Sequence, residues 1–221
     1  MDPSIITSLR LSVQVAAAAT TMVLIAGLPA AYLLARRDFA LREMADALIT
    51  LPLVLPPTVT GYYLIVLFGR NGLIGGPLEQ ITGWTVMFTW QAAVIASAVV
   101  ALPLMVKTAR AAIESVDRNL LDASATLGHS ELWTAFRVTL PLARRGIIAG
   151  TVLTFARAMG EFGATLMLAG NIPGRTDTMP LAIYSAATGG DRGRADVMVL
   201  LFTALSVLFL FAANRLGRRG W

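Results

Sequence analysis

The chain has 221 residues, of which 56% are hydrophobic and 14% are charged, and its mean hydropathy is +0.69. Soluble domains carry about 25% charged residues, so this composition excludes a water-soluble fold, which would leave too much apolar surface uncovered. The net charge of +5 comes from basic residues spread over separate segments rather than gathered beside aromatic residues, which argues against a nucleic-acid partner. With no cysteine, disulfides and thiolate metal sites are excluded.

Five apolar stretches are each long enough, at about 20 residues, to cross a bilayer as a helix. The first stretch is not preceded by a Lys/Arg-rich segment and is longer than the apolar core of a cleaved export signal. We therefore expect it to be a helix that the protein retains. Residues 179–187 are too few to span and predict an outer-face or re-entrant helix, although counting it would give six spans. The five stretches are Leu9 to Ala35, Ala47 to Phe68, Trp84 to Val106, Ile147 to Ala169 and Val197 to Asn214.

Basic residues are distributed unequally between the two sides of these stretches. Because basic residues near helix ends are retained in the cytoplasm, the asymmetry predicts a multi-pass inner-membrane protein with its N-terminus outside and its C-terminus inside. The basic residues of the predicted cytoplasmic side are Arg36, Arg37, Arg42, Lys107, Arg110, Arg118, Arg137, Arg144, Arg145, Arg215, Arg218 and Arg219, against Arg10, Arg70, Arg175, Arg192 and Arg194 on the other.

Prolines interrupt several of these stretches, and each removes a backbone donor and tends to kink a helix. For Pro29 and Pro103 we expect ordinary packing in a bundle, where neighbours satisfy the freed carbonyls. The run Leu51–Pro57, LPLVLPP, holds three prolines. Two interpretations of this run stay open: ordinary packing, and a broken helix that lines a pathway.

A polar segment from Asp122 to Pro141, DASATLGHSELWTAFRVTLP, separates the third and fourth apolar stretches. We expect Asn119 to cap a short helix through Leu127, Gly128 to allow a left-handed turn, and Ser130 to cap a second short helix. The prediction is an L-shaped pair of helices within residues 119–141, exposed to the cytoplasm.

This segment has the features of a surface that docks a partner. Ala123, Ser124 and Gly128 keep one side thin enough to enter a groove. Trp133 and Phe136 supply large apolar area of the kind that anchors interfaces.

The alternative to partner docking is an amphipathic helix lying on lipid headgroups. Asp122 and Glu131 argue against it, because acidic residues gain nothing from an anionic inner leaflet. His129 is the only histidine of the chain. We expect a solvated loop residue there, and no metal site.

Arg157 and Glu161 lie four residues apart in the fourth apolar stretch, so we expect both on one helix face. Ionisable groups at that depth usually face the bundle interior or a water-filled route, which makes this face a candidate wall of a translocation pathway. Two interpretations stay open: an ion pair that fixes helix orientation, and an arginine that offers positive potential to a passing anion. Thr154 and Thr165 supply hydroxyl donors there, or bond back to their own helix.

Five glycines lie within this stretch or directly at its ends. Gly146 and Gly150 form a small-xxx-small ridge, which favours close helix approach, and Gly160, Gly163 and Gly170 follow it. This helix is a candidate for contact with a second copy of the chain.

The polar loop at residues 171–196 is predicted to lie on the outer face. Its arginines either pair with acidic groups of a partner or are solvated charges compensated by neighbouring aspartates, and both interpretations stay open. The arginines are Arg175, Arg192 and Arg194, and the aspartates are Asp177, Asp191 and Asp196.

Two motifs resemble those of a transporter family. Asp122-Ala123-Ser124 with Gly128 and Val138-x-Leu140-Pro141 resembles the cytoplasmic motif of ABC importer permeases, with Asp122 in place of glutamate and Ser124 in place of a second alanine. The stretch Arg157–Tyr184, which contains GEFGATLMLAGNIPGRT and PLAIY, resembles the permease subunit of molybdate ABC transporters, with sulfate permeases as near relatives. The likeness covers nearly the whole chain from Leu9 onward.

The resemblance implies an all-α, type I ABC importer permease formed by residues 1–221 as one domain, without a cofactor. It implies import of an oxyanion, molybdate before tungstate or sulfate. The implied partners are a second copy of the chain, two cytoplasmic ATPase subunits docked on the Asp122–Pro141 segment, and an extracytoplasmic oxyanion-binding protein near Arg175, Arg192 and Arg194.

The sequence lacks the residues expected of a motor or an enzyme. It has no GxxxxGK[ST] loop, since its only lysine, Lys107, follows Val106. No catalytic constellation with a soluble cleft occurs either. The rival from another class, a self-sufficient ion-coupled transporter, predicts inverted repeats with matching broken helices. Only Leu51–Pro57 shows that pattern.

Overall fold

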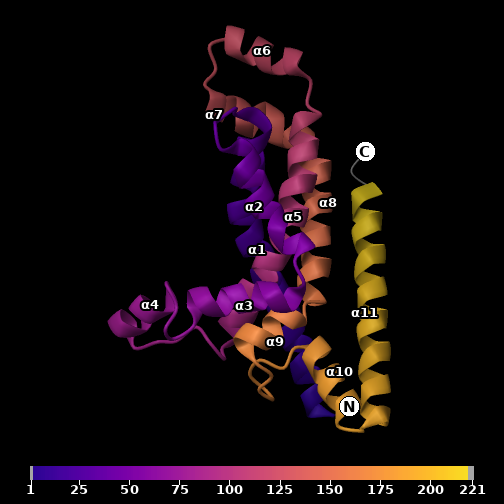
Figure 1. The fold of residues 1–221 in the computed structure, drawn as a ribbon. Coiled ribbons are helices and arrows are strands. Elements are labelled where there is room, and N and C mark those ends of the chain that lie inside the picture. Colours follow the sequence, from indigo (N-terminus) through magenta and orange to yellow (C-terminus); the bar gives the residue numbers. More distant parts are fainter. Residues whose placement is uncertain (1, 219–221) are drawn as a thin grey trace.

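The computed structural model describes residues 2–218, and its regular elements in that range are all helical (Figure 1). Four helices are long and apolar enough to cross a membrane, and a sharply bent helix pair makes a fifth crossing if it counts as one span. The helices are α1 (Pro3–Arg36), α2 (Arg42–Val54), α3 (Pro57–Phe68), α4 (Gly75–Thr82), α5 (Trp90–Glu114), α6 (Arg118–Thr126), α7 (Glu131–Thr134), the π-helix η1 (Ala135–Thr139), α8 (Leu140–Met159), α9 (Gly163–Ala169), α10 (Met179–Thr188) and α11 (Arg192–Arg218).

The core is a bundle of α1, α5 and α8, and small side chains bring its helices together. Alanines of α1 and α5, such as Ala16, Ala19 and Ala101, are fully buried. On α8, a Cβ added to Gly146 would overlap the Cβ of Ala112 on α5, and one added to Gly150 would lie 3.1 Å from the Sδ of Met105. The Gly146/Gly150 ridge therefore packs against α5 of the same chain, and is not available to a second copy.

We expect Gly146→Ala to lower the stability of the purified protein by about 1 to 3 kcal/mol, because overpacking a tight contact forces the backbones apart. Thermal unfolding in detergent measures the loss. Gly193→Ala is the matched control, since nothing lies within 4 Å of a Cβ there. Adding Ala112→Gly to Gly146→Ala should restore stability, and a failure to do so would mean that the two helices do not meet at this pair.

The second and third apolar stretches differ from their predicted bounds. The stretch expected at Ala47–Phe68 is two helices, α2 and α3, bent by 119°. The break follows Val54, where Pro56 and Pro57 interrupt the helix and Pro57 starts α3. The broken-helix interpretation of Leu51–Pro57 is thus confirmed as a shape. The third helix begins at Trp90 rather than Trp84, capped by the Thr89 side chain.

The fourth predicted stretch is also broken, which the sequence analysis missed. Helix α8 ends at Met159, and α9 starts at Gly163. Helices α3 and α9 then pack closely, since an added Cβ would lie 2.7 Å from Met167 at Gly61 and 2.8 Å from Pro57 at Gly163. The two broken helices therefore meet on glycines, and their junction lies beside the core bundle (Figure 1).

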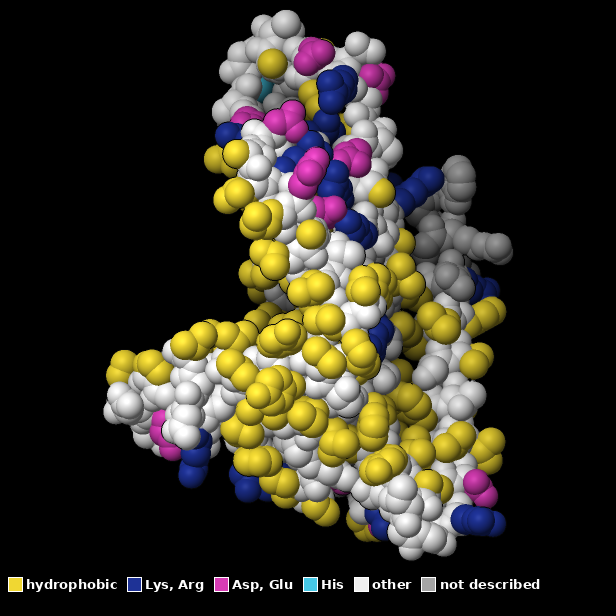
Figure 2. Space-filling model, viewed as in Figure 1, with side chains coloured by type: hydrophobic (Ala, Val, Ile, Leu, Met, Phe, Trp, Pro, Cys, Tyr) yellow, Lys and Arg dark blue, Asp and Glu magenta, His cyan; other side chains and the backbone are white. Residues whose placement is uncertain are grey.

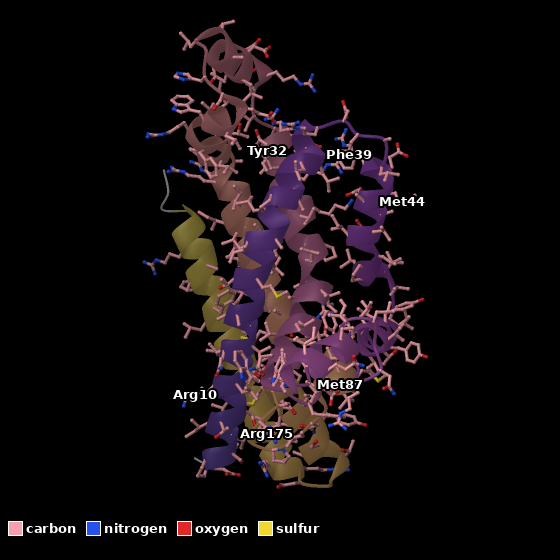
Figure 3. The ribbon with its side chains drawn as sticks, turned by 90° about the vertical axis from the view of Figure 1, so that its left-hand side faces the viewer. Arg10, Tyr32, Phe39, Met44, Met87 and Arg175 are labelled. Atoms are coloured by element: carbon pink, nitrogen blue, oxygen red, sulfur yellow. The ribbon has the colours of Figure 1, made fainter. Side chains whose placement is uncertain are left out.

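The two ends of the molecule differ in character. Helices α6 and α7 form one end, called here the α6 end, and α10 with the start of α1 forms the other, the α10 end (Figure 1). The prediction of a short helix at residues 179–187 is confirmed by α10. Charged side chains gather toward the α6 end, above a broad hydrophobic zone (Figure 2). Arg10 and Arg175 lie toward the opposite end from Tyr32 and Phe39 (Figure 3).

Candidate functional site

The α6 end is a helical hairpin whose first arm is α6. Its N-terminus is capped by Asp117, whose carboxylate accepts a hydrogen bond from the Asn119 amide at 2.9 Å. The prediction that Asn119 caps this helix is therefore wrong by two residues. Asp117 was missed because two residues that favour N-caps lie close together in the sequence.

The turn between the arms depends on Gly128, whose φ of +81° is the left-handed conformation that was predicted there. The amide of His129 donates to the Ser124 carbonyl at 3.2 Å, and the Gly128 amide donates to the Ala125 carbonyl at 2.9 Å. This pair of bonds is the Schellman motif, which needs a left-handed residue at the position of the glycine.

The second arm starts as predicted but does not form a separate helix. The Ser130 hydroxyl caps α7 by accepting from the Trp133 amide at 3.3 Å. After four residues α7 passes into η1 and then into α8 without a break. The L-shaped pair is therefore one free helix and the start of a membrane-spanning helix. A π-helical turn of this kind is often found at functional sites.

A buried hydrogen bond joins the two arms. The hydroxyls of Ser124 and Thr134 lie 2.7 Å apart, and both residues are buried. Ser124 therefore faces the inside of the hairpin, which corrects its prediction as part of the thin outer side. Asp122 and Ala123 are exposed beside it.

The outside of the hairpin carries apolar side chains that the fold leaves uncovered. Phe136 is 68% exposed and Trp133 42%, as expected of docking residues. Leu132, at 72%, and Leu127, at 76%, are exposed too, although only the two aromatic residues were expected to supply the docking area. His129 is exposed and stacks on Trp133 with ring centroids 3.6 Å apart. An apolar patch on a polar end of a molecule is typical of a protein interface.

Of the three remaining motif residues, Val138 and Leu140 are half-buried, and Pro141 is exposed in the first turn of α8. The hairpin is tied to α1 by an ion pair between Arg37 Nη2 and Glu131 Oε2 at 2.5 Å. Glu131 therefore has a partner inside the chain.

Six charged residues connect α2 to α5 near the α6 end. Lys107 and Arg110 of α5 both reach Asp46, at 2.7 and 3.3 Å. Helix α2 buries none of its residues fully, and these ion pairs add to the packing of Ala45 and Ile49 against the core. Three of the basic residues predicted on the cytoplasmic side, Arg42, Lys107 and Arg110, are thus part of one network of ion pairs. It is completed by Arg110 with Glu114, Arg42 with Glu114 and Arg42 with Asp38. The Arg219 residue predicted on the same side lies outside the described residues, as does the Arg218 side chain.

Arg157 and Glu161 form an ion pair at the break between α8 and α9. Arg157 Nη1 lies 2.8 Å from Glu161 Oε2, and the Glu161 side chain is 1% exposed against 30% for Arg157. The expectation of one shared helix face is wrong, because α8 ends between them. The other carboxylate oxygen accepts from the Ala164 amide at 2.8 Å. Glu161 therefore holds the last turn of α8 to the first turn of α9.

The two threonines predicted near this pair behave differently. Thr154 is buried and donates to the Gly150 carbonyl of its own helix at 2.8 Å. Thr165 is also buried, but its hydroxyl has no hydrogen-bond partner within residues 2–218, and the same holds for Thr60 of α3. These two unpaired hydroxyls thus lie on α3 and α9, the two helices that pack against each other beside the break.

At the α10 end the three predicted arginines differ in exposure and in hydrogen bonding. Arg175 and Arg192 are exposed, whereas Arg194 donates to the Ser4 hydroxyl at 2.6 Å and lies 3.6 Å from Asp2. The Ser4 amide, which donates to the Asp2 carboxylate, lowers the pKa of Asp2, and the charge of Arg194 adds to this effect. Arg194 therefore joins α11 to α1.

Compensation of the loop arginines by Asp177 was one of the two open interpretations, and the structure excludes it for this residue. It is buried and accepts from the Ser8 hydroxyl at 3.0 Å and from the Gly174 amide at 2.8 Å. Its carboxylate thus fixes the 171–178 loop onto α1. In the described part of the chain, no group of three His, Cys, Asp or Glu side chains is placed to hold a metal ion.

Comparison with known proteins identifies the fold. The chain superposes on the MetNI methionine ABC transporter in inward-facing conformations with a TM-score of 0.77 and 18% identity, covering 99% of this chain and 98% of that one. It superposes on a bacterial ABC transporter that imports the polysaccharide alginate with a TM-score of 0.75 and 16% identity, covering 100% of this chain and 81% of that one. The fold is that of ABC importer membrane subunits.

Sequence comparison identifies the family. Residues 23–220 match the binding-protein-dependent transport system inner membrane component family. The chain is 44% identical to the putative molybdenum transport system permease protein YvgM of Bacillus subtilis, over 93% of this chain and 90% of that protein. It is 44% identical to the molybdenum transport system permease protein ModB of Escherichia coli K12, over 94% and 91%. The chain therefore belongs to the family of binding-protein-dependent transport inner membrane components and, within it, to the molybdenum transport permeases.

Proposed function

We propose that this protein is the membrane subunit of an ATP-driven importer that carries an oxyanion, molybdate before tungstate or sulfate. The observation that carries the proposal is the identity with named molybdenum permeases over more than nine tenths of the chain. The helix break with its buried ion pair supports it, because broken helices at membrane depth border cavities where substrates pass.

Arg157 is the residue we propose to meet the anion. Glu161 engages one of its Nη atoms, and the side chain remains 30% exposed, so guanidinium donors are left for an oxygen of the substrate. Oxyanions are recognised by such charge-assisted bonds. The unpaired Thr165 hydroxyl on α9 is the second proposed donor of the pathway.

The α6 end is proposed to lie in the cytoplasm, which places the N-terminus outside and the C-terminus inside. Two copies of the chain, each acting as one permease domain, enclose the pathway. One ATPase subunit docks on the hairpin of each copy. ATP hydrolysis takes place on those separate subunits. An extracytoplasmic delivery protein meets the α10 end, where Arg175 and Arg192 are free to contact it. Arg194 already has partners within the chain.

Purification of the tagged chain from its native membrane tests this assembly. We expect two copies of the chain with two ATPase subunits, and uptake of radioactive molybdate into vesicles only when ATP and the delivery protein are supplied. Sulfate in excess should compete weakly. Uptake by the chain alone, driven by an ion gradient, would contradict the proposal in favour of a secondary transporter.

A further inference from the structure

An apolar groove of about 350 Å³ lies between the end of α1 and the second arm of the hairpin. Tyr32 and Leu33 belong to its α1 wall, and Leu132 and Phe136 to the wall from α7 and η1. The ion pair between Arg37 and Glu131 lies at its polar edge. Leu33 is 50% exposed, so both walls present uncovered apolar surface.

The position of this groove along the membrane normal, relative to the Lys107–Asp46 ion pair, indicates what covers it. Gly27 of α1 packs beside Met105 and Val106, which immediately precede Lys107 and its ion pair with Asp46. Charged side chains avoid the hydrocarbon region, so this level marks its cytoplasmic boundary. Leu33 lies six residues beyond Gly27, about 9 Å along the helix, and Arg37 follows just past the end of α1. The groove therefore rises from the boundary toward the cytoplasm, in the direction of the Tyr32 label (Figure 3).

Lipid tails do not reach far beyond the charged layer, and apolar side chains that line a groove there, unlike singly exposed ones, are suited to a protein partner. The groove is also continuous with the proposed docking surface, because Leu132 and Phe136 contribute to both. We infer that the end of α1 and the hairpin form one socket, and that an apolar segment of the ATPase subunit fills it. This inference rests on the proposed function and extends the docking surface to α1.

The absence of cysteine from the sequence makes the test direct. A photoreactive maleimide on Leu33→Cys, in the purified complex in lipid vesicles, should cross-link to the ATPase at least five times more than the same probe on Met44→Cys. Met44 is a matched control, because it is 58% exposed near the same end but lies on α2, away from the groove (Figure 3). Adducts of Leu33→Cys with lipid or with a second permease would overturn the inference.

A charged substitution in the groove distinguishes a failure of this inference from a failure of the proposed function. Leu33→Asp should weaken ATPase association at least tenfold, whereas Met44→Asp should leave it within twofold; unchanged melting temperatures would show that both variants are folded. If Gly128→Val abolishes association and Leu33→Asp does not, the hairpin docks the ATPase without α1 and the inference is wrong. If no ATPase accompanies even the wild-type chain, the proposed function itself fails.

Discussion

Replacing Gly128 with valine is expected to lower transport and ATPase association together by at least tenfold. Gly128 has φ +81°, and a left-handed conformation costs an L-residue roughly 1 to 2 kcal/mol, more for a β-branched one. The Schellman bonds would be lost, and the hairpin would no longer present Trp133 and Phe136 together. Co-purification with the ATPase and vesicle uptake measure the two effects.

Two further substitutions vary backbone strain and bulk at this turn, since asparagine lowers the strain whereas tryptophan keeps it and adds bulk. No atom of the described residues lies within 4 Å of a Cβ at Gly128, so a side chain there points into open space, where a partner would meet it. Asparagine tolerates the left-handed region, so Gly128→Asn should keep the turn and much of the association. Gly128→Trp should block docking by its bulk. Wild-type uptake and ATPase association in both Gly128→Val and Gly128→Trp would show that the hairpin is not part of the docking surface.

The second large effect is expected at the ion pair of the helix break. Arg157→Gln leaves the carboxylate of Glu161, which is 1% exposed, without its cation, and breaking a buried pair in this way costs about 3 kcal/mol. Glu161→Gln should cost less, because its amide oxygen still accepts from the Ala164 amide and the remaining Arg157 is partly exposed. Thermal unfolding of the purified complex measures both.

The double variant Arg157→Gln/Glu161→Gln distinguishes the two roles that the sequence left open for the arginine. It buries no unpaired charge, so much of the stability lost in Arg157→Gln should return. If Arg157 meets the anion, uptake stays low in the stable double variant and the apparent KM for molybdate rises. Recovery of uptake together with stability would leave the pair a structural role alone.

The sequence predicted those features that depend on local composition. Apolar length predicted the crossings, glycine predicted the left-handed turn at Gly128, and Ser130 was correctly expected to cap the second arm. The proline run at Leu51–Pro57 offered the break between α2 and α3 as one of two interpretations. Each of these depends on the residues in place, without reference to a distant part of the chain.

The features that were missed depend on contacts between distant segments. The break after Met159 has no proline to announce it, and it is held by the carboxylate of Glu161 and by packing of α9 on α3. Ser124 was expected outside because its partner, Thr134, lies on the other arm. Gly146 was open to a second copy or to the chain itself, and only the position of Ala112 decides between them.

Helix α1 links the two aqueous faces directly. Its Ser8 hydroxyl holds Asp177, its Ser12 hydroxyl accepts from the Met179 amide at 2.6 Å, and its far end holds the hairpin through Arg37. Helix α1 runs over 34 residues without a break, although Pro29 removes one backbone donor within it, so both sets of contacts belong to one element. A shift imposed at one end of α1 would therefore reach the 171–178 loop at the opposite end without passing through either broken helix.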